Sequence, residues 1–440
     1  MKYKESKIWH PFTQHGLEEP IIKIKNAKDE FLYTEDGKTI IDGISSWWVN
    51  TLGHSNPEII KAIQAQAEKL QQVIFAGFTH EPAEDVAAKL RGFLPPELEY
   101  TFFSDSGSTS VEVALKMAVG YFHNNGIENK TKIVAFEKSY HGDTFGGMSS
   151  GARGVFNKPY KNMLFETIHL PFPEKNYEDK TINAFKKLLQ EQASEIAAII
   201  IEPLILGSGG MLMYDAFVID ELYKLAKEYD VFFILDEVMT GFGRTGTMFA
   251  FEQTNIVPDI ICLSKGLTGG NLPLALTITT KEIYEAFYSK NKADMFFHSS
   301  SYTANPIACA AAVANLKIWE TEPILDKVKK INQYHLIKKQ EFEQNSLECR
   351  VGSLPHRQNI NANRYEIKNL RILGSIFAFD IKVDDGGYLA NISKDLYAFY
   401  LKNNVLLRPL GNTVYVMPPY CISQESLDKI YNIIGEGVNR

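Results

Sequence analysis

Two charged residues in the middle of the chain, Asp236 and Lys265, have types and settings that indicate chemistry. Each closely follows a short apolar run, VFFIL before the aspartate and IICL before the lysine. Apolar runs of this length, bounded by Gly and Pro, predict buried strands. In an open α/β sheet, ligands bind in the crevice outside the carboxyl ends of the strands. A carboxylate and an amine at two strand ends therefore predict a cofactor site.

Pyridoxal phosphate is a cofactor that this pair fits. A lysine binds its aldehyde covalently, and a carboxylate keeps the pyridine nitrogen protonated so that the ring can accept electrons. Lys265 and Asp236 match these two roles. A lysine after a strand is usually just solvated, so the hypothesis depends on whether the chain also supplies a phosphate site, an aromatic face and a substrate-binding cation.

The stretch SDSGSTSVEVALKMAVGYF predicts a helix whose first turn could bind phosphate. Thr109 and Glu112 fit a capping box, and the apolar residues that follow have a helical period. Gly107 and Ser108 then lie at the helix N-terminus, where free N–H groups and the helix dipole favour an anion. An ordinary capped helix would look similar, so both interpretations stay open on this stretch alone.

The loop KSYHGDTFGG follows another predicted strand and carries Tyr140, His141 and Asp143. It offers a flat ring for stacking and titratable groups near the same crevice, and its glycines let the backbone approach a ligand closely. A surface turn with a structurally bonded His141 is an equally good interpretation.

Substrate-binding candidates lie near both ends of the chain. Trp47 and Trp48 are adjacent in a Gly/Ser-bounded loop, and if the chain there is extended they cannot both face one core. At least one is then expected to meet a ligand or partner, although packing of both stays open. Arg408 lies in VLLRPLGNTVYVMPP, predicted as a hairpin around Gly411-Asn412, and its planar guanidinium could bind a substrate carboxylate.

The surrounding elements predict an α/β fold. Strand and helix patterns alternate through the first two thirds of the chain, which favours a mainly parallel sheet covered by helices on both faces. We expect a large cofactor-binding domain over residues 57–321 and a smaller α+β domain over 322–440. Residues 1–56, with a hairpin turn at Asp36-Gly37, are assigned to the small domain, and the polar segment 353–369 is predicted to be a loop.

Composition narrows the class of protein. The chain has 440 residues, of which 45% are hydrophobic and 22% charged, so a globular protein is expected. Its net charge of -7 and the absence of a basic cluster argue against nucleic-acid binding. Four widely spaced cysteines indicate buried thiols and no metal site. No signal peptide or membrane span is recognisable, so a cytosolic location is expected.

Two rival functions use the same stretch. Gly241, Gly243 and Gly246 spell GxGxxG after a strand, a pattern typical of NAD-dependent dehydrogenases. Five residues separate the strand from the first glycine, and no clear helix follows the last, so the signal is weak. The other rival is a catalytically silent cofactor-fold domain used for regulation. The intact Lys265 and the lack of a DNA-binding module argue against it.

The segments LDEVMTGFGRTG, CLSKGLTGG, DSGSTSVEVALKMA and YHGDTFGGMS together resemble the class III, pyridoxal-phosphate-dependent aminotransferases, and the resemblance covers nearly the whole chain. It implies a fold like that of aspartate aminotransferase (fold type I). It also implies that Lys265 holds the cofactor and shuttles a proton, that Asp236 pairs with the pyridine nitrogen, and that Tyr140 stacks on the ring.

The resemblance further implies a homodimer with active sites at the subunit interface. Gly107 and Ser108 would hold the phosphate together with Ser301 of the partner subunit. Trp47 and Trp48 would line the acceptor pocket, and Arg408 would bind the acceptor carboxylate. By motif position, further pocket residues are Phe12, Asp143, Arg244 and Ser300.

Four more segments, WHPFT, DGISSWW, ANPIACAAA and RPLGNTVYVMPPY, narrow the resemblance to members that aminate 8-amino-7-oxononanoate. S-adenosylmethionine is the expected amino donor, with lysine as the alternative; another ω-amino substrate is a further alternative. Phe12 stands where many members have Tyr, which removes a hydroxyl and leaves the donor open. Ser301 stands where Thr is common and keeps the hydroxyl.

Overall fold

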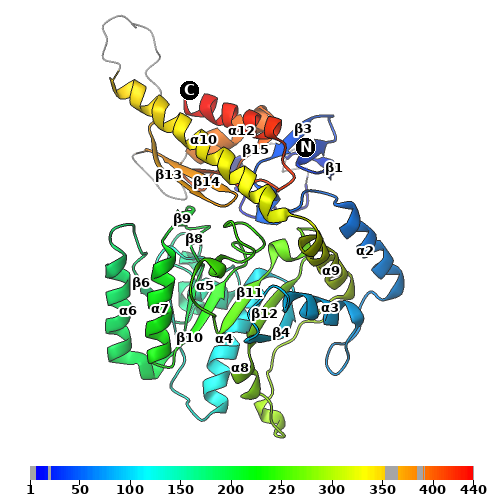
Figure 1. The fold of residues 1–440 in the computed structure, drawn as a ribbon, viewed down its shortest axis with the longest axis vertical. Helices are drawn as coiled ribbons and strands as arrows, with labels where there is room; N and C mark the ends of the chain where they lie inside the picture. The colour runs from blue at the N-terminus through cyan, green and yellow to red at the C-terminus, as the bar shows by residue number, and fades with distance from the viewer. Residues whose placement is uncertain (1–5, 18–20, 352–364, 384–389, 391, 440) are drawn as a thin grey trace, which may run out of the picture.

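A seven-stranded sheet forms the centre of the larger part of the molecule (Figure 1). The computed structural model describes residues 6–17, 21–351, 365–383, 390 and 392–439. All strands of this sheet run in one direction except β12, which is antiparallel to both of its neighbours. In spatial order the strands are β4 (Leu98–Ser104), β12 (Ala275–Thr280), β11 (Ile260–Leu263), β10 (Phe232–Asp236), β7 (Ile196–Ile201), β5 (Lys132–Phe136) and β6 (Thr167–Leu170).

Three smaller sheets complete the strands. A four-stranded sheet joins the two ends of the chain, because the N-terminal strands pair with a C-terminal one: β1 (Ile24–Lys28), β2 (Phe31–Thr34), β3 (Thr39–Asp42) and β15 (Val405–Leu406). A three-stranded sheet contains β13 (Ile367–Leu373), β14 (Ile376–Ile381) and β16 (Thr413–Val416), and a two-stranded sheet contains β8 (Ile205–Leu206) and β9 (Leu212–Met213). Figure 1 shows the first two of these sheets grouped on one side of the large sheet, beside both termini.

The helices of the larger part are α2 (Pro57–Lys69), α3 (Glu81–Leu90), α4 (Gly107–Asn124), α5 (Phe145–Ser150), α6 (Glu178–Gln192), α7 (Ala216–Glu228), α8 (Lys281–Glu285) and α9 (Pro306–Thr321). The C-terminal part contributes α10 (Ile324–Val351), α11 (Ile392–Lys402) and α12 (Gln424–Val438). A four-residue element, α1 (Ser45–Trp48), has non-helical backbone angles and is described below as the tryptophan turn.

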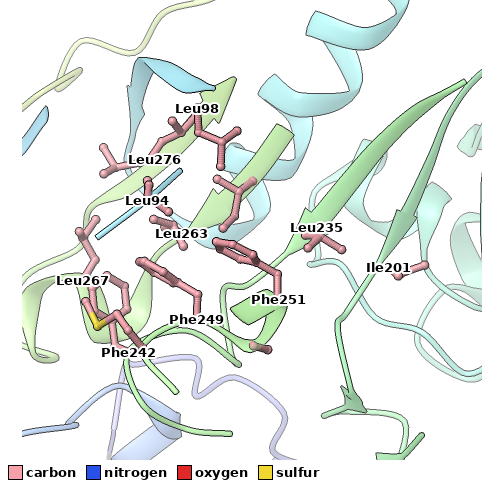
Figure 2. Close-up of a cluster of buried hydrophobic side chains, with 14 of the residues drawn as sticks. Leu94, Leu98, Ile201, Leu235, Phe242, Phe249, Phe251, Leu263, Leu267 and Leu276 are labelled. Atoms are coloured by element: carbon pink, nitrogen blue, oxygen red, sulfur yellow. The ribbon is translucent and has the colours of Figure 1, made fainter. Parts of the chain in front are cut away.

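The large sheet is buried on both faces. In β10, Phe233 and Leu235 belong to one apolar cluster, and Phe232 and Ile234 belong to another that includes the apolar face of α4. Figure 2 shows part of the first cluster, including Leu235 of β10 and Phe251. Strands buried on both faces need continuous apolar sequence, which is why these runs do not alternate with polar residues. The predicted α/β class and mainly parallel sheet are confirmed.

Three local predictions are wrong in part. The chain does turn at Gly411-Asn412, where Leu410 and Thr413 form an antiparallel bridge, but the flanking strands do not continue it as a hairpin, because β15 pairs with β3 whereas β16 pairs with β14. The capping box of α4 is formed by Ser106 and Thr109, while Glu112 accepts hydrogen bonds from the α5 backbone. Residues 353–364 of the polar segment predicted as a loop lie outside the described residues, but its last three residues belong to β13.

The cysteines divide by position. Cys262 and Cys309 are buried, as predicted, whereas Cys421 is only partly buried. The side chain of Cys349 lies outside the described residues. Across the described part of the chain, we find no helix with the length and apolarity that a membrane crossing requires.

Candidate active site

The sheet brings Asp236 and Lys265 to neighbouring strand ends. Strand β10 ends at Asp236, which is in register with Cys262 of the adjacent parallel strand β11. Lys265 begins a 3₁₀ turn, Lys265–Thr268, two residues after β11 ends, and its φ of 46° is left-handed. Both residues therefore lie at the carboxyl edge of the sheet, as the sequence predicted.

A buried amide fixes the turn that presents the lysine. The Nδ2 atom of Asn315, on α9, donates to the carbonyls of Gly266 and Leu267, at 2.9 and 3.0 Å. Asn315 is fully buried, so these bonds are shielded from water. Sequence reasoning missed this residue, since an Asn within a small-residue helix carries no signal of what it contacts.

The environment of Lys265 makes its amine more nucleophilic. Burial lowers its pKa to about 8, although the negative charges of Asp236 and Glu202 act in the opposite direction. The Nζ atom lies 4.7 Å from the centre of the Trp48 ring. A lysine with a lowered pKa is partly uncharged near neutral pH, which is the form that attacks a carbonyl carbon.

Asp236 is held in place by a histidine. Its Oδ2 atom lies 2.8 Å from Nδ1 of His141, and its Oδ1 accepts from the backbone N–H of Val238. Both side chains are buried. His141 is thus part of the site and not a surface residue, which resolves the alternative that its sequence left open. Its Nε2 is buried and has no partner among the described residues.

The Tyr140 loop is fixed by a second buried carboxylate. Glu202, directly after β7, accepts hydrogen bonds from the backbone N–H groups of Tyr140 and Gly207. Burial raises the pKa of Glu202 to about 7. Burial, together with the nearby Asp143 carboxylate, also raises the pKa of the Tyr140 hydroxyl far above its usual value. Tyr140 is therefore neutral throughout the physiological range.

The first turn of α4 lies against the loops that carry Asp236 and Tyr140. A Cβ atom on Gly107 would come within 2.5 Å of Val238 Cγ1, and one on Gly142 within 2.0 Å of Ser108 Oγ. The Ser108 hydroxyl also accepts from the Asp143 backbone N–H. The capping box satisfies the N–H groups of Ser106 and Thr109, so those of Gly107 and Ser108 stay available for an anion.

These residues fit pyridoxal phosphate. A carboxylate for the pyridine nitrogen, an amine for the aldehyde, two free N–H groups for the phosphate and a neutral aromatic ring all meet at one sheet edge. Asp236, Lys265, Gly107, Ser108 and Tyr140 would hold the group. The close approach at Gly107 explains why a residue without a side chain stands there.

A row of aromatic rings leads away from Tyr140. The centre of the Phe156 ring lies 6.5 Å from the centre of the Tyr140 ring and 6.0 Å from that of Phe12. The Phe12 and Trp47 ring centres are 5.5 Å apart. Sequence reasoning missed Phe156, a single aromatic residue in irregular chain. These side chains form a row of apolar rings from Tyr140 to Trp47, which we call the apolar path.

Arg408 lies at the far end of this path. Its guanidinium carbon is 5.1 Å from the centre of the Trp47 ring and 5.8 Å from that of Tyr397. One of its N–H groups donates to the carbonyl of Phe12. Within the described residues, Arg408 forms no ion pair with a carboxylate. A cation that has no carboxylate partner in the described part of the chain, and that lies beside apolar rings, is suited to a ligand that ends in a carboxylate.

The two tryptophans have different environments. Trp47 is exposed, at 41%, whereas Trp48 is 3% exposed and donates from Nε1 to the Tyr415 hydroxyl. The two rings do face different surroundings, although the chain here forms a turn and not the extended segment on which the expectation was based. Of the two, Trp47 is free to meet a ligand along its face, and Trp48 forms the wall beside Lys265.

The remaining candidates occupy mixed positions. Arg244 is buried and donates to the carbonyls of Trp48 and Pro418, so it holds the end of the tryptophan turn in place. Asp143 is exposed, next to Ser108. The Ser300 hydroxyl donates to Asp105, directly before the α4 cap, and Ser301 is exposed. Within this one chain, Ser301 does not join the other candidates.

The glycines of the dinucleotide-like motif have structural roles. A Cβ on Gly243 would lie 2.8 Å from the Trp319 ring, and Gly241 donates its N–H to the Glu237 carbonyl. Only turns and a short 3₁₀ segment follow the motif before β11, so it has no helix N-terminus to bind a pyrophosphate. The dehydrogenase alternative is therefore wrong.

The chain matches known proteins over its whole length. The family model described as "Aminotransferase class-III" matches residues 12–438. An adenosylmethionine-8-amino-7-oxononanoate aminotransferase of Synechococcus elongatus is 42% identical over 98% of this chain and 97% of its own length. One of the same name from Helicobacter pylori is 37% identical over 96% of this chain and 93% of its own length.

Solved structures agree with this assignment. The crystal structure of an adenosylmethionine-8-amino-7-oxononanoate aminotransferase from Methanocaldococcus jannaschii is 33% identical, with a TM-score of 0.89, and covers 99% of this chain and 98% of its own. An amine transaminase from an uncultivated Pseudomonas species in its PLP-bound form is 27% identical, with a TM-score of 0.88 over 98% of both chains. With its strand-end lysine and aspartate, the chain belongs to the pyridoxal-phosphate-dependent class III aminotransferases.

Proposed function

We propose that this enzyme transfers an amino group from S-adenosylmethionine to 8-amino-7-oxononanoate and so makes 7,8-diaminononanoate for biotin synthesis. The observation that carries the proposal is the Arg408 guanidinium, which lies beside the Trp47 ring without a carboxylate partner among the described residues. The acceptor is a long aliphatic chain that ends in a carboxylate. It matches an apolar path that ends in a cation.

The bound cofactor supplies an electron sink and carries the amino group between the two substrates. Lys265 provides the amine that holds and releases it, and its lowered pKa suits it to accept and return a proton at Nζ near neutral pH. Asp236, oriented by His141, would pair with the pyridine nitrogen. The Trp48 ring lies beside the Lys265 amine, with Nζ 4.7 Å from the ring centre.

We also infer that the enzyme works as a homodimer in which Ser301 of the partner subunit completes the phosphate site. Large apolar side chains are exposed near this serine in the sequence, with Phe297 and Tyr302 each at 64%. Ile74 and Phe78 are also exposed and follow Gln72, which donates to the Ser301 carbonyl. Exposed apolar side chains gathered around one loop favour a protein contact there.

The deciding experiment is a half-reaction. Protein loaded with pyridoxal phosphate is mixed with S-adenosylmethionine or with lysine, and the visible absorbance of the cofactor is followed. The proposal expects conversion with S-adenosylmethionine, followed by recovery of the original spectrum when 8-amino-7-oxononanoate is added. Conversion with lysine but not with S-adenosylmethionine would show that lysine is the amino donor. Failure of the oxononanoate to restore the spectrum would refute the acceptor.

A variant supports the assignment of the lysine. Lys265→Ala should abolish turnover and bind the cofactor only noncovalently, so borohydride should no longer fix it to the protein. The matched control is Lys224→Ala on α7, a lysine outside the site, which should leave both properties unchanged. Retained covalent labelling in Lys265→Ala would show that another amine holds the cofactor.

A further inference from the structure

The tryptophan turn, Ser45–Trp48, has an unusual backbone. Ser45, Ser46 and Trp48 all have positive φ, at 53°, 60° and 68°, although none is a glycine. Ser46 also has ψ of -94°, and Trp47 leaves the helical region at φ -122°. Positive φ is costly for residues with a side chain and persists only where the surroundings enforce it.

A buried carboxylate holds Ser46 in this turn, together with Asn50, whose Nδ2 donates to the Ser46 hydroxyl. Asp42, the last residue of β3, is fully buried. Its Oδ2 accepts from the Ser46 backbone N–H at 2.6 Å and from the Ser46 hydroxyl at 3.1 Å, and its Oδ1 accepts from the Ile44 N–H. His54 Nε2 lies 2.8 Å from the same Oδ2. The carboxylate thus binds the residue that directly precedes Trp47.

Other groups hold Ser45 and Trp48, the first and last residues of the turn. The Trp48 carbonyl accepts from Arg244, and its indole N–H donates to Tyr415. The Ser45 hydroxyl donates to the Met417 carbonyl. The two tryptophans are therefore fixed separately, Trp48 by Arg244 and Tyr415 and Trp47 through Asp42.

We propose that Asp42 is a positioning residue for acceptor recognition: by holding Ser46 in its strained conformation, it sets the Trp47 ring against Arg408. The inference rests on the proposed function, because it takes the Trp47–Arg408 pair as the end of the acceptor pocket. Asp42 itself touches neither Trp47 nor Arg408 in any contact of the structure. Its effect on the acceptor passes through the backbone of the turn.

Kinetics provide the first test. Asp42→Asn keeps one acceptor oxygen and the side-chain volume but cannot accept from Ile44, Ser46 and His54 together. We expect the KM for 8-amino-7-oxononanoate to rise about tenfold or more, because a displacement of about 1 Å in a positioned group has effects of this size. The kcat should fall less than about threefold, because Trp48 stays fixed beside Lys265. An unchanged KM would overturn the proposal.

Ser46→Gly separates positioning from general damage. Glycine reaches φ near 60° without a steric cost, so the turn should no longer depend on the carboxylate. The double variant Asp42→Asn/Ser46→Gly should recover a KM within about threefold of the wild-type value. A double variant as impaired as Asp42→Asn alone would show that Asp42 acts by another route.

Glu30→Gln is the matched control. Glu30 is a buried carboxylate on the neighbouring hairpin, and it accepts three hydrogen bonds from Ser423 and Ser426 at the start of α12. It resembles Asp42 in burial and bonding but does not contact the tryptophan turn. This variant should lower the melting temperature and leave the acceptor KM unchanged. A KM rise equal to that of Asp42→Asn would contradict a specific role for Asp42.

Hydrogen exchange tests the turn without cofactor or substrate. The N–H groups of Ser46, Trp48, Val49 and Asn50 are hydrogen-bonded within or to the turn. In the cofactor-free protein, Asp42→Asn should speed their exchange about tenfold or more, and Ser46→Gly should reverse the effect. Unchanged exchange would refute the inference. A wild-type enzyme that does not react with the oxononanoate would refute the proposed function. The exchange rates would then still decide whether Asp42 holds the turn.

Discussion

At the scale of single residues, the site depends on charged groups that are held in unusual states. Lys265 has its pKa lowered to about 8, and Glu202 has its pKa raised to about 7, both mainly by burial. Perturbed groups of this kind gather at functional sites because catalysis needs protonation states that water would not favour. Arg408 adds a charge without a carboxylate partner among the described residues.

The Lys265 pKa predicts how cofactor uptake depends on pH. Only the uncharged amine attacks the aldehyde, and deprotonation increases as the pH rises through the pKa. The rate at which cofactor-free protein takes up pyridoxal phosphate should therefore increase from pH 6.5 to 9.5, with a midpoint at about 8. Stopped-flow absorbance measures this rate. A midpoint near 10.5, the ordinary value for lysine, would show that burial does not control the amine.

Arg408 should control acceptor affinity. Arg408→Ala removes the cation at the end of the aromatic path, so the KM for 8-amino-7-oxononanoate should rise about 30-fold, corresponding to about 2 kcal/mol for a lost charged hydrogen bond. Arg408→Lys should raise the KM for 8-amino-7-oxononanoate less than Arg408→Ala does, since lysine keeps the charge but not the planar fork. Steady-state kinetics at saturating donor measure the effect. An unchanged KM in Arg408→Ala would remove this residue from the pocket.

At the scale of elements, strand ends and helix starts place the chemistry. Strands β10 and β11 deliver Asp236 and Lys265, and the loop after β5 packs against the first turn of α4. Gly142 is the closest point of that packing, with φ of 119° and no room for a side chain beside Ser108. The proposed phosphate site at Gly107 and Ser108 therefore depends on a glycine that packs against it from another loop.

Gly142→Ala should weaken cofactor binding because the new methyl group displaces Ser108. The expected loss of pyridoxal phosphate affinity is about tenfold or more. Gly126→Ala is the control, since Gly126 also has positive φ, at 78°, but has open space around its Cβ position. Both variants carry backbone strain, and only the first should lose cofactor in an equilibrium titration. Equal losses would show that strain, and not the contact with Ser108, is responsible.

Some structural elements could be predicted from the sequence better than others. Buried strands and the charges at their ends were predictable, because a long apolar run followed by a polar residue has few alternative structures. The turn at Gly411-Asn412 was predicted correctly, but the pairing of the strands around it was not, because the turn signal is local whereas β15 and β16 pair with strands far away in the sequence. The roles of Arg244, Asn315 and Phe156 could not be predicted, because they depend on contacts between distant segments.

At the scale of the whole molecule, the two ends of the chain meet at the residues proposed to bind the acceptor. Strand β15 pairs with β3, so Arg408 and the tryptophan turn follow two adjacent strands of one small sheet. The large sheet supplies the lysine and the aspartate. In the proposed function, recognition of the acceptor and binding of the cofactor therefore come from separate sheets.

The proposed homodimer predicts complementation between two inactive variants. Ser301→Asp would repel the phosphate, and Lys265→Ala removes the amine. If the partner subunit's Ser301 completes each site, a hybrid dimer has one site with both defects and one intact site. Refolding the two variants together should restore about a quarter of the wild-type activity, since about half of the dimers are hybrids with one working site each.

The control for this experiment is each variant refolded alone, which should stay inactive. A mixture without activity would show that Lys265 and Ser301 of the same chain share a site. Sedimentation of the wild-type protein provides a second check. A monomer at the concentration used in the assay would contradict the dimer directly.

The separation of the two sheets has a consequence for engineering. The hydrogen bonds of Asn315 hold the lysine turn to α9 without involving the N-terminal sheet, β15 or the Arg408 segment. Libraries that vary Phe12, Trp47 and Arg408 can therefore explore new amine products while the cofactor machinery stays intact. Such libraries should leave Asp42 unchanged, because a turn that is no longer held at Ser46 would distinguish less well between acceptors of similar length.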